Sequence, residues 1–154
     1  MKRVSVLLVV LAAALFVARP LAQAPAAARV IEVDATEQMK FSVTALTAKP
    51  GETIKVRLKA VGTMPKMAMS HNFVLLQASA DAAAFANESA MAGPAANYIA
   101  AAKKAQVIAS TPLAGGGETV EVTFKAPAKA GAYTYLCSFP GHFAAGMKGV
   151  LTVK

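Results

Sequence analysis

The fold and the chemistry of this chain follow from the segment CSFPGHFAAGM, residues 137–147. It holds the only cysteine, Cys137, with His142 five residues later and Met147 five residues after that. The Pro-Gly pair before the histidine favours a turn, and the glycine before the methionine permits the unusual dihedral angles of a reversal. The segment therefore predicts a tight loop that gathers a thiolate, an imidazole and a thioether.

A second imidazole comes from His71, which lies far upstream in the sequence Met-Ser-His-Asn-Phe. Two imidazoles, one thiolate and a weak axial thioether form the donor set of a mononuclear blue-copper electron-transfer site. Such a near-trigonal set suits both Cu(I) and Cu(II), as rapid electron transfer requires. We therefore predict four copper ligands, which are His71, Cys137, His142 and Met147.

The small number of metal-binding side chains argues against other metal sites. A binuclear copper centre needs a second cysteine, and multicopper oxidases and copper nitrite reductases need histidines beyond the two in this chain. A closed zinc site usually takes four strong ligands, and a thioether is a poor fourth ligand for zinc. With no open coordination position and no spare acid–base residue, a redox enzyme is the weakest interpretation.

Alternation of apolar and polar residues predicts an all-β fold. In residues 53–60, Ile54, Val56 and Leu58 alternate with cationic side chains, which is the pattern of a half-buried strand. Three segments alternate in this way and five shorter runs are rich in β-forming residues, and these eight short strands, separated by Pro-Gly and Gly-rich turns, indicate a β-sandwich or barrel. The expected strands are residues 30–34, 39–45, 53–60, 73–77, 105–109, 118–124, 132–137 and 149–153.

One region departs from this pattern. Residues 79–104 are rich in alanine, and their larger apolar side chains recur at roughly helical spacing. Gly93 and Pro94 divide the region into two short helical pieces. We expect a crossover connection that covers one edge of the sandwich and takes no part in the chemistry.

The N-terminus has the features of an export signal. Lys2 and Arg3 precede an apolar stretch over residues 4–18, which is shorter than the roughly 20 residues of a membrane span. We predict a signal peptide at residues 1–24, cleaved somewhere within 22–28, and a single domain at 25–154. These features predict a periplasmic protein, or a membrane-tethered one if the segment is not cleaved.

The charge of the exported part is moderately positive. Without Lys2, Arg3 and Arg19, the sixteen basic residues fall to thirteen, against eight acidic ones. Such an excess favours solubility or steering towards an acidic partner or a membrane face. The lysines do not cluster, so we expect no binding of nucleic acid.

The chain resembles small blue-copper proteins of the azurin and auracyanin type, which belong to the cupredoxin family. The resemblance runs from about residue 30 to the end and is carried by 38–41, 64–75, 107–111 and the loop 137–147. It implies an eight-stranded Greek-key β-sandwich (a plastocyanin/azurin-like domain). It also implies one copper ion per chain, held equatorially by two histidines and the cysteine and axially by Met147. The side chain of Asn72 would then tie the two ligand segments together near Ser138.

The resemblance also implies a one-electron carrier that is not an enzyme. His142 would expose its ring edge within an apolar patch where redox partners dock, such as a c-type cytochrome, an oxidase or a reductase. An alternative is a periplasmic Cu(I)-binding chaperone that uses the methionines near His71. The residues available for the patch are Met64, Pro65, Met67, Met69, Phe139, Pro140 and Phe143.

Overall fold

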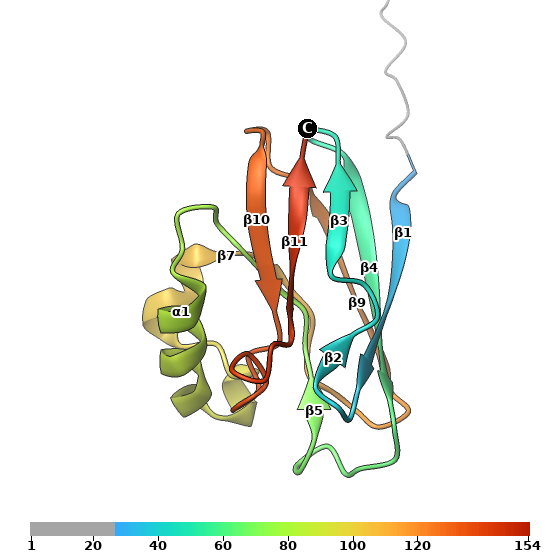
Figure 1. The fold of residues 1–154 in the computed structure, drawn as a ribbon, viewed down its shortest axis with the longest axis vertical. Helices are drawn as coiled ribbons and strands as arrows, with labels where there is room; N and C mark the ends of the chain where they lie inside the picture. Colours follow the sequence, from blue (N-terminus) through green and yellow to red (C-terminus); the bar gives the residue numbers. More distant parts are fainter. Residues whose placement is uncertain (1–26) are drawn as a thin grey trace, which may run out of the picture.

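Two β-sheets packed face to face form the body of the molecule, as Figure 1 shows for the computed structural model. The structure describes residues 27–154, so the predicted signal peptide lies outside the described residues. Both sheets contain strands from distant parts of the chain, and this arrangement confirms the predicted sandwich. All eight predicted runs contain a strand, although one of them is broken.

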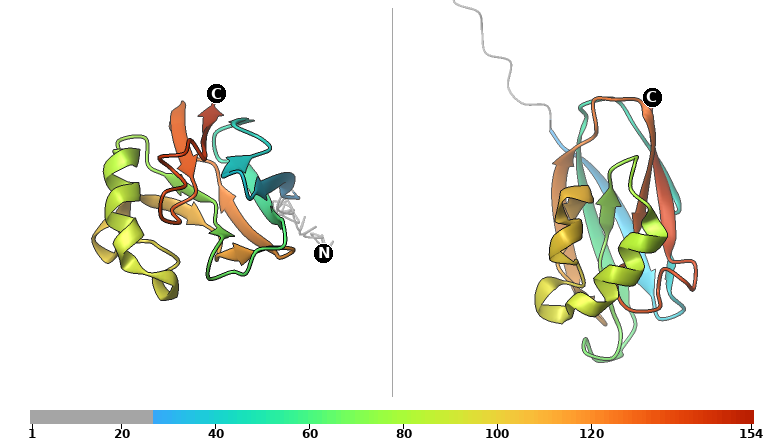
Figure 2. Two further views of the ribbon diagram at one scale, coloured as in Figure 1. Left: turned by 60° about the horizontal axis from the view of Figure 1, so that its bottom comes forward. Right: turned by 90° about the vertical axis from the view of Figure 1, so that its left-hand side faces the viewer.

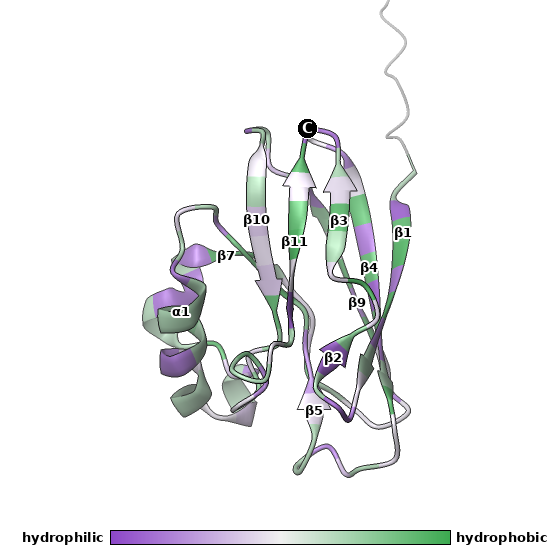
Figure 3. Ribbon diagram, in the orientation of Figure 1, coloured by the Kyte–Doolittle hydropathy of each residue, from purple (hydrophilic) through white to green (hydrophobic). Residues whose placement is uncertain are grey.

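The first sheet has the strand order β2-β1-β4-β9. Its inward side chains are buried at every second residue of β4, including Ile54, Val56 and Leu58, as the alternation predicts. The same alternation appears as hydropathy bands along β1 and β4 in Figure 3. The bounds of these strands are β1 Arg29–Thr36, β2 Lys40–Phe41, β4 Thr53–Val61 and β9 Thr119–Lys125.

The second sheet has the strand order β3-β11-β10-β6-β7, and β5 and β8 form a separate short pair. Strands β10 and β11 form an antiparallel hairpin whose connection is the loop 137–147. The loop therefore emerges at the end of the sandwich opposite the C-terminus (Figure 1). The bounds are β3 Ala45–Ala48, β5 Ser70–His71, β6 Val74–Leu76, β7 Val107–Ser110, β8 Ala114–Gly115, β10 Gly131–Leu136 and β11 Lys148–Val153.

The prediction of one continuous strand over 39–45 is wrong. Strand β2 pairs with β1 in the first sheet, whereas β3 pairs with β11 in the second, so the chain changes sheets between them. The backbone turns sharply before this crossing, where Met39 adopts a left-handed conformation with φ of 56°. The buried positions also shift at this crossing, from Phe41 in β2 to Leu46 and Ala48 in β3, so that Ala45 is exposed.

The main core lies between the two sheets and reaches the cysteine-containing loop. At its centre the rings of Phe73 and Tyr135 stack with centroids 4.8 Å apart, and both side chains are fully buried. The hydroxyl of Tyr135 donates a hydrogen bond to the carbonyl of Val43 at 2.6 Å. Cys137 and Met147 belong to the same apolar cluster, so the loop is anchored in the core.

Residues 79–104 form the predicted helical insertion beside the second sheet (Figure 2). The N-cap Asp81 accepts hydrogen bonds from the backbone of the first helical turn. Gly93 separates the helix from the later turns, as predicted. Within residues 27–154, no helix has the length and apolar character needed to span a bilayer. The helical elements are α1 Ala82–Ser89, η1 Ala90–Ala92, η2 Pro94–Ala96 and η3 Ala101–Gln106.

Candidate metal centre

The four predicted ligands come from the end of β5 and from the connection between β10 and β11. His71 is the last residue of β5, and Cys137 directly follows β10. Met147 directly precedes β11, and His142 lies in the loop between these strands. Three ligands thus come from one hairpin connection and the fourth from a separate strand pair, which fixes both sides of the site to the sheets.

Backbone hydrogen bonds close the loop on itself. The N–H of Met147 donates to the carbonyl of His142 at 2.9 Å, and the N–H of Cys137 donates to the carbonyl of Met147 at 3.1 Å. Gly141 and Gly146 adopt φ values of +83° and +90°, which other residues rarely adopt. Both glycines therefore have the turn-forming role that the sequence predicted.

The ligand atoms of His71, Cys137 and His142 all lie within 4.8 Å of one another. The sulfur of Cys137 is 3.3 Å from Nδ1 of His142, and the centroids of the two imidazole rings are 4.9 Å apart. The three side chains are 1%, 0% and 2% exposed, respectively, and Met147 is fully buried. The structure therefore brings the three strong donors together in a water-excluded site, with Met147 hydrogen-bonded to the same loop.

One ring nitrogen of His71, Nδ1, is buried without a hydrogen-bond partner among the described residues, as expected for a metal ligand. An unpartnered buried nitrogen destabilises a fold, whereas a neutral imidazole with a free lone pair is a good ligand for copper. Together with a buried thiol and a thioether, this nitrogen completes a soft N and S donor set that fits copper.

Burial shifts the protonation of all three strong donors. It lowers the pKa of His71 and His142 to about 4 and raises the pKa of Cys137 to about 12. The backbone N–H groups of Asn72 and Phe139 bond to the sulfur and oppose part of the rise in the pKa of Cys137. At neutral pH both imidazoles are therefore neutral and ready to bind, while the thiol keeps its proton until a metal displaces it.

These pKa values predict the pH dependence of metal binding. Between about pH 6 and about pH 9, binding of Cu(I) is expected to release about one proton per chain, because only the thiol is still protonated. The affinity should then rise about tenfold for each pH unit. Calorimetry in buffers with different ionisation enthalpies measures this proton. Binding without proton release would contradict the account, and Cys137→Ser serves as the control that has no thiol proton to release.

Asn72 links the two ligand segments, as the family resemblance implied. Its Oδ1 accepts a hydrogen bond from the backbone N–H of Ser138, and its Nδ2 donates to the hydroxyl of Ser138, both at 2.9 Å. Asn72 and Ser138 are 0% and 1% exposed. Since Asn72 follows His71 and Ser138 follows Cys137, these buried bonds fix the separation of two ligands.

Two further residues hold the site, and the sequence analysis did not identify them. The carbonyl of Asn97, within the insertion, accepts hydrogen bonds from Asn72 Nδ2 at 2.9 Å and from the Ser138 hydroxyl at 3.3 Å. The hydroxyl of Thr111 accepts a bond from the N–H of Phe73 at 3.0 Å. The insertion therefore does more than cover an edge of the sandwich, because Asn97 hydrogen-bonds to both ligand segments.

His142 is buried against Phe139, one of the residues expected to form the apolar patch. His142 is 2% exposed, so the predicted exposed ring edge is wrong. The ring of Phe139 lies over it, with centroids 4.7 Å apart. Met67 is 79% exposed and Met64 is 39% exposed, which makes them surface groups beside the site instead of core residues.

The loop that carries these methionines is held by Glu37, which the sequence analysis did not identify. Its Oε1 accepts hydrogen bonds from the N–H groups of Thr63 and Met64, at 2.7 and 2.8 Å. These bonds hold the pKa of Glu37 below its usual range. Gly62 leaves space for this carboxylate, because a Cβ at position 62 would overlap it.

Comparison with known proteins agrees with this donor set. Residues 27–154 match the family described as copper binding proteins, plastocyanin/azurin family. The chain belongs to this family. It is 46% identical over 119 residues to auracyanin-A of Chloroflexus aurantiacus, a match that covers 77% of this chain and 69% of that protein. It is 42% identical over 127 residues to azurin of Pseudomonas denitrificans, covering 80% of this chain and 97% of azurin.

The solved structures give the same result for the fold. The structure of auracyanin A, described as a "blue" copper protein from Chloroflexus aurantiacus, superposes with a TM-score of 0.71 and 43% identity. The match covers 83% of this chain and all of that one. Membership of the plastocyanin/azurin family makes copper the metal of this chain, and the two histidines with Cys137 and Met147 form its candidate type 1 site.

Proposed function

We propose that this chain is a one-electron carrier rather than an enzyme. His71, Cys137 and His142 would hold the copper equatorially and Met147 axially. The observation that carries the proposal is the convergence of three buried donor atoms within 4.8 Å, two from the loop 137–147 and one from β5, with the two segments joined by a hydrogen bond between Asn72 and Ser138. Bound copper supplies a single electron by alternating between Cu(I) and Cu(II).

The protein's own residues would keep the site nearly unchanged during that exchange. The neutral imidazoles add no charge, and the N–H groups of Asn72 and Phe139 stabilise a thiolate on Cys137. The hydrogen bonds of Asn72 with Ser138 resist any change in the separation of the ligand segments. Burial of the site excludes water, which would otherwise reorganise with each change of charge.

The electron would leave through the side chains that cover His142. We define the apolar patch as Met64, Pro65, Met67, Met69, Phe139, Pro140 and Phe143. Within it the ring of Phe139 bridges His142 and the surface. Accessible apolar side chains around a metal ligand suit brief docking through a small contact. The proposed donor is a c-type cytochrome or a quinol-oxidising complex, and the proposed acceptor is an oxidase, a reductase or a reaction centre.

We further propose that the protein works in the periplasm. The support is the positively charged start of the chain and its short apolar stretch at residues 4–18, followed by the small-residue segment Ala22-Gln23-Ala24. The moderate positive charge of residues 25–154 would also attract the protein to an acidic membrane face, which supports peripheral contact with the membrane.

A Cu(I) chaperone is the second candidate, and the exposure of the methionines favours it. Met67 and Met64 lie on the surface close to His71 in sequence, and thioethers bind Cu(I) readily. A chaperone would bind Cu(I) without the thiolate and would exchange electrons slowly. Cys137 and its buried partners favour the carrier.

Electron transfer to the Cu(II)-loaded protein tests the proposal, with a reduced, soluble c-type cytochrome as donor in stopped-flow absorption. We expect rapid second-order transfer, slowed about fivefold by Met67→Gln because an exposed apolar contact is lost. The matched control is Val30→Gln, which changes a 50% exposed residue near the start of β1. This strand begins at the end of the sandwich opposite the ligand loop (Figure 1), so the control should have no effect. Tight Cu(I) binding with no electron transfer would support the chaperone instead. Equal rates for the two variants would exclude docking at the patch.

A further inference from the structure

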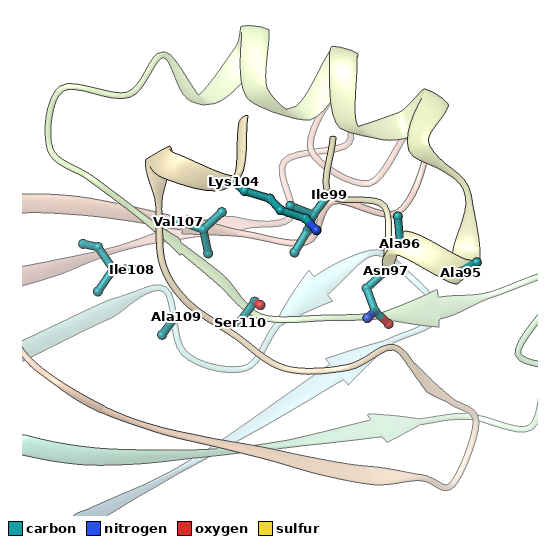
Figure 4. A pocket seen from close by; sticks show the side chains of 9 residues that line it. All are labelled: Ala95, Ala96, Asn97, Ile99, Lys104, Val107, Ile108, Ala109 and Ser110. Atoms are coloured by element: carbon teal, nitrogen blue, oxygen red, sulfur yellow. The ribbon is translucent and has the colours of Figure 1, made fainter. Parts of the chain in front are cut away.

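The helical insertion is joined to the sandwich by an apolar contact and a polar one. The apolar contact is a small cluster in which Phe85 and Ile99 pack against Leu136 and its neighbours. Elsewhere a groove of about 480 Å³ separates the insertion from β7. Figure 4 shows Asn97 at one end of this groove, on the segment that follows η2. The polar contact is made at Asn97.

Asn97 completes the hydrogen bonding of the Asn72 side chain. One side of the Asn72 amide bonds to Ser138, and the remaining N–H donor reaches the carbonyl of Asn97 at 2.9 Å. Without that acceptor, a fully buried N–H group would have no partner. The acceptor therefore fixes the rotation of the Asn72 amide and keeps its oxygen directed at the N–H of Ser138.

The backbone at this contact is strained. Asn97 and Tyr98 adopt φ values of 52° and 50°, so two successive non-glycine residues lie in the left-handed region. The N–H groups of these residues donate to the carbonyls of Pro94 and Gly93, at 2.9 and 3.0 Å. The side chain of Asn97 accepts from the N–H of Leu113 at 3.1 Å. Strain of this kind persists where the surrounding contacts over-determine it, and it gathers at functional sites.

Tyr98, the neighbour of Asn97, contacts Phe139, which packs against His142. Its ring meets the ring of Phe139 edge-on, with centroids 5.1 Å apart, and Phe139 in turn lies 4.7 Å from the ring of His142. The strained pair therefore supports the site through Asn72 on one side and through Phe139 on the other.

We propose that Asn97 is a positioning residue for the copper site. Its left-handed backbone directs a carbonyl at Asn72, and Asn72 sets the separation of the segments that carry His71 and Cys137. The insertion then has two roles, because it covers an edge of the sheet and also stiffens the metal centre. This inference rests on the proposed type 1 copper site.

The test compares Asn97→Gly with Asn97→Val. Glycine keeps the left-handed conformation and the carbonyl, whereas a β-branched residue disfavours that conformation strongly. In the metal-free protein, Asn97→Val should speed hydrogen exchange of the Ser138 amide about tenfold, as for the loss of one hydrogen bond. The Val56 amide, in the central strand β4, serves as the reference for global opening and should be much less affected. Asn97→Gly should leave both amides within about twofold of the wild type.

The Cu(II)-loaded proteins provide the second readout. We expect Asn97→Val to shift the visible and electron paramagnetic resonance spectra of the copper, while Asn97→Gly preserves them. Unchanged spectra and unchanged Ser138 exchange in Asn97→Val would overturn the inference, as would equal acceleration at Ser138 and Val56. If Asn97→Val does not fold, Asn97→Ala replaces it with the same criteria. A wild type without a blue copper spectrum would instead reject the proposed function, so the two failures are distinct.

Discussion

Replacing Asn72 by alanine is expected to lower the free energy of unfolding of the metal-free protein by about 2–4 kcal/mol. The change removes hydrogen bonds to Ser138 and to the carbonyl of Asn97 at a fully buried position. It also leaves the buried N–H of Ser138 without its acceptor, which adds a desolvation penalty. Urea unfolding followed by circular dichroism measures the loss.

The matched control for this variant is Asn87→Ala. Asn87 is exposed in the middle of α1, so its replacement should change the free energy of unfolding by no more than about 0.5 kcal/mol. Equal values for the two variants would show that the bonds of Asn72 add nothing to stability. The bonds of Asn72 would then not be what fixes the separation of His71 and Cys137.

Gly149→Ala is expected to destabilise the protein by about 3 kcal/mol through overpacking. Gly149 lies directly opposite Tyr135 in the hairpin of β10 and β11. A Cβ on Gly149 would overlap the phenol of Tyr135 and lie 2.6 Å from the carbonyl oxygen of Thr44. The phenol cannot move aside easily, since it is buried, stacked on Phe73 and hydrogen-bonded to Val43.

Thermal or urea unfolding measures this loss, and Gly51→Ala separates the overlap from a general cost of replacing glycine. Gly51 has a φ of +72° with open space around its Cα, so alanine there meets only backbone strain, about 1 kcal/mol. If Gly149→Ala lowers the free energy of unfolding no more than Gly51→Ala does, the Tyr135 ring moves aside to accommodate the added methyl group. The close packing of the core beneath the ligand loop would then be refuted.

Most of the site was predictable because three of its four predicted ligands lie within one short stretch of sequence. The spacing of Cys137, His142 and Met147 and the two glycines between them determine a loop whose backbone closes on itself. His71 could be added because it is the only other imidazole in the chain. The strands were predictable for the same reason, since alternation marks burial on one face.

The remaining features depend on contacts that no local pattern records. Asn97 acts through a main-chain carbonyl in a left-handed conformation, and the only signal was an asparagine shortly after Gly93-Pro94. The break between β2 and β3 was hidden because apolar residues recur at alternate positions throughout residues 39–45, although Ala45 at the end of this run is exposed. The low exposure of His142 depends on how Phe139 packs over it, which spacing does not specify.

The most direct test of the central claim is the visible absorption and electron paramagnetic resonance of residues 25–154 loaded with Cu(II), compared with Cys137→Ser. We expect an intense blue thiolate-to-copper band and a narrow hyperfine splitting in the wild type. Both should be lost in Cys137→Ser, which differs by one buried atom. A colourless wild type, or a Cys137→Ser variant that keeps the blue band, would contradict a copper centre built on Cys137.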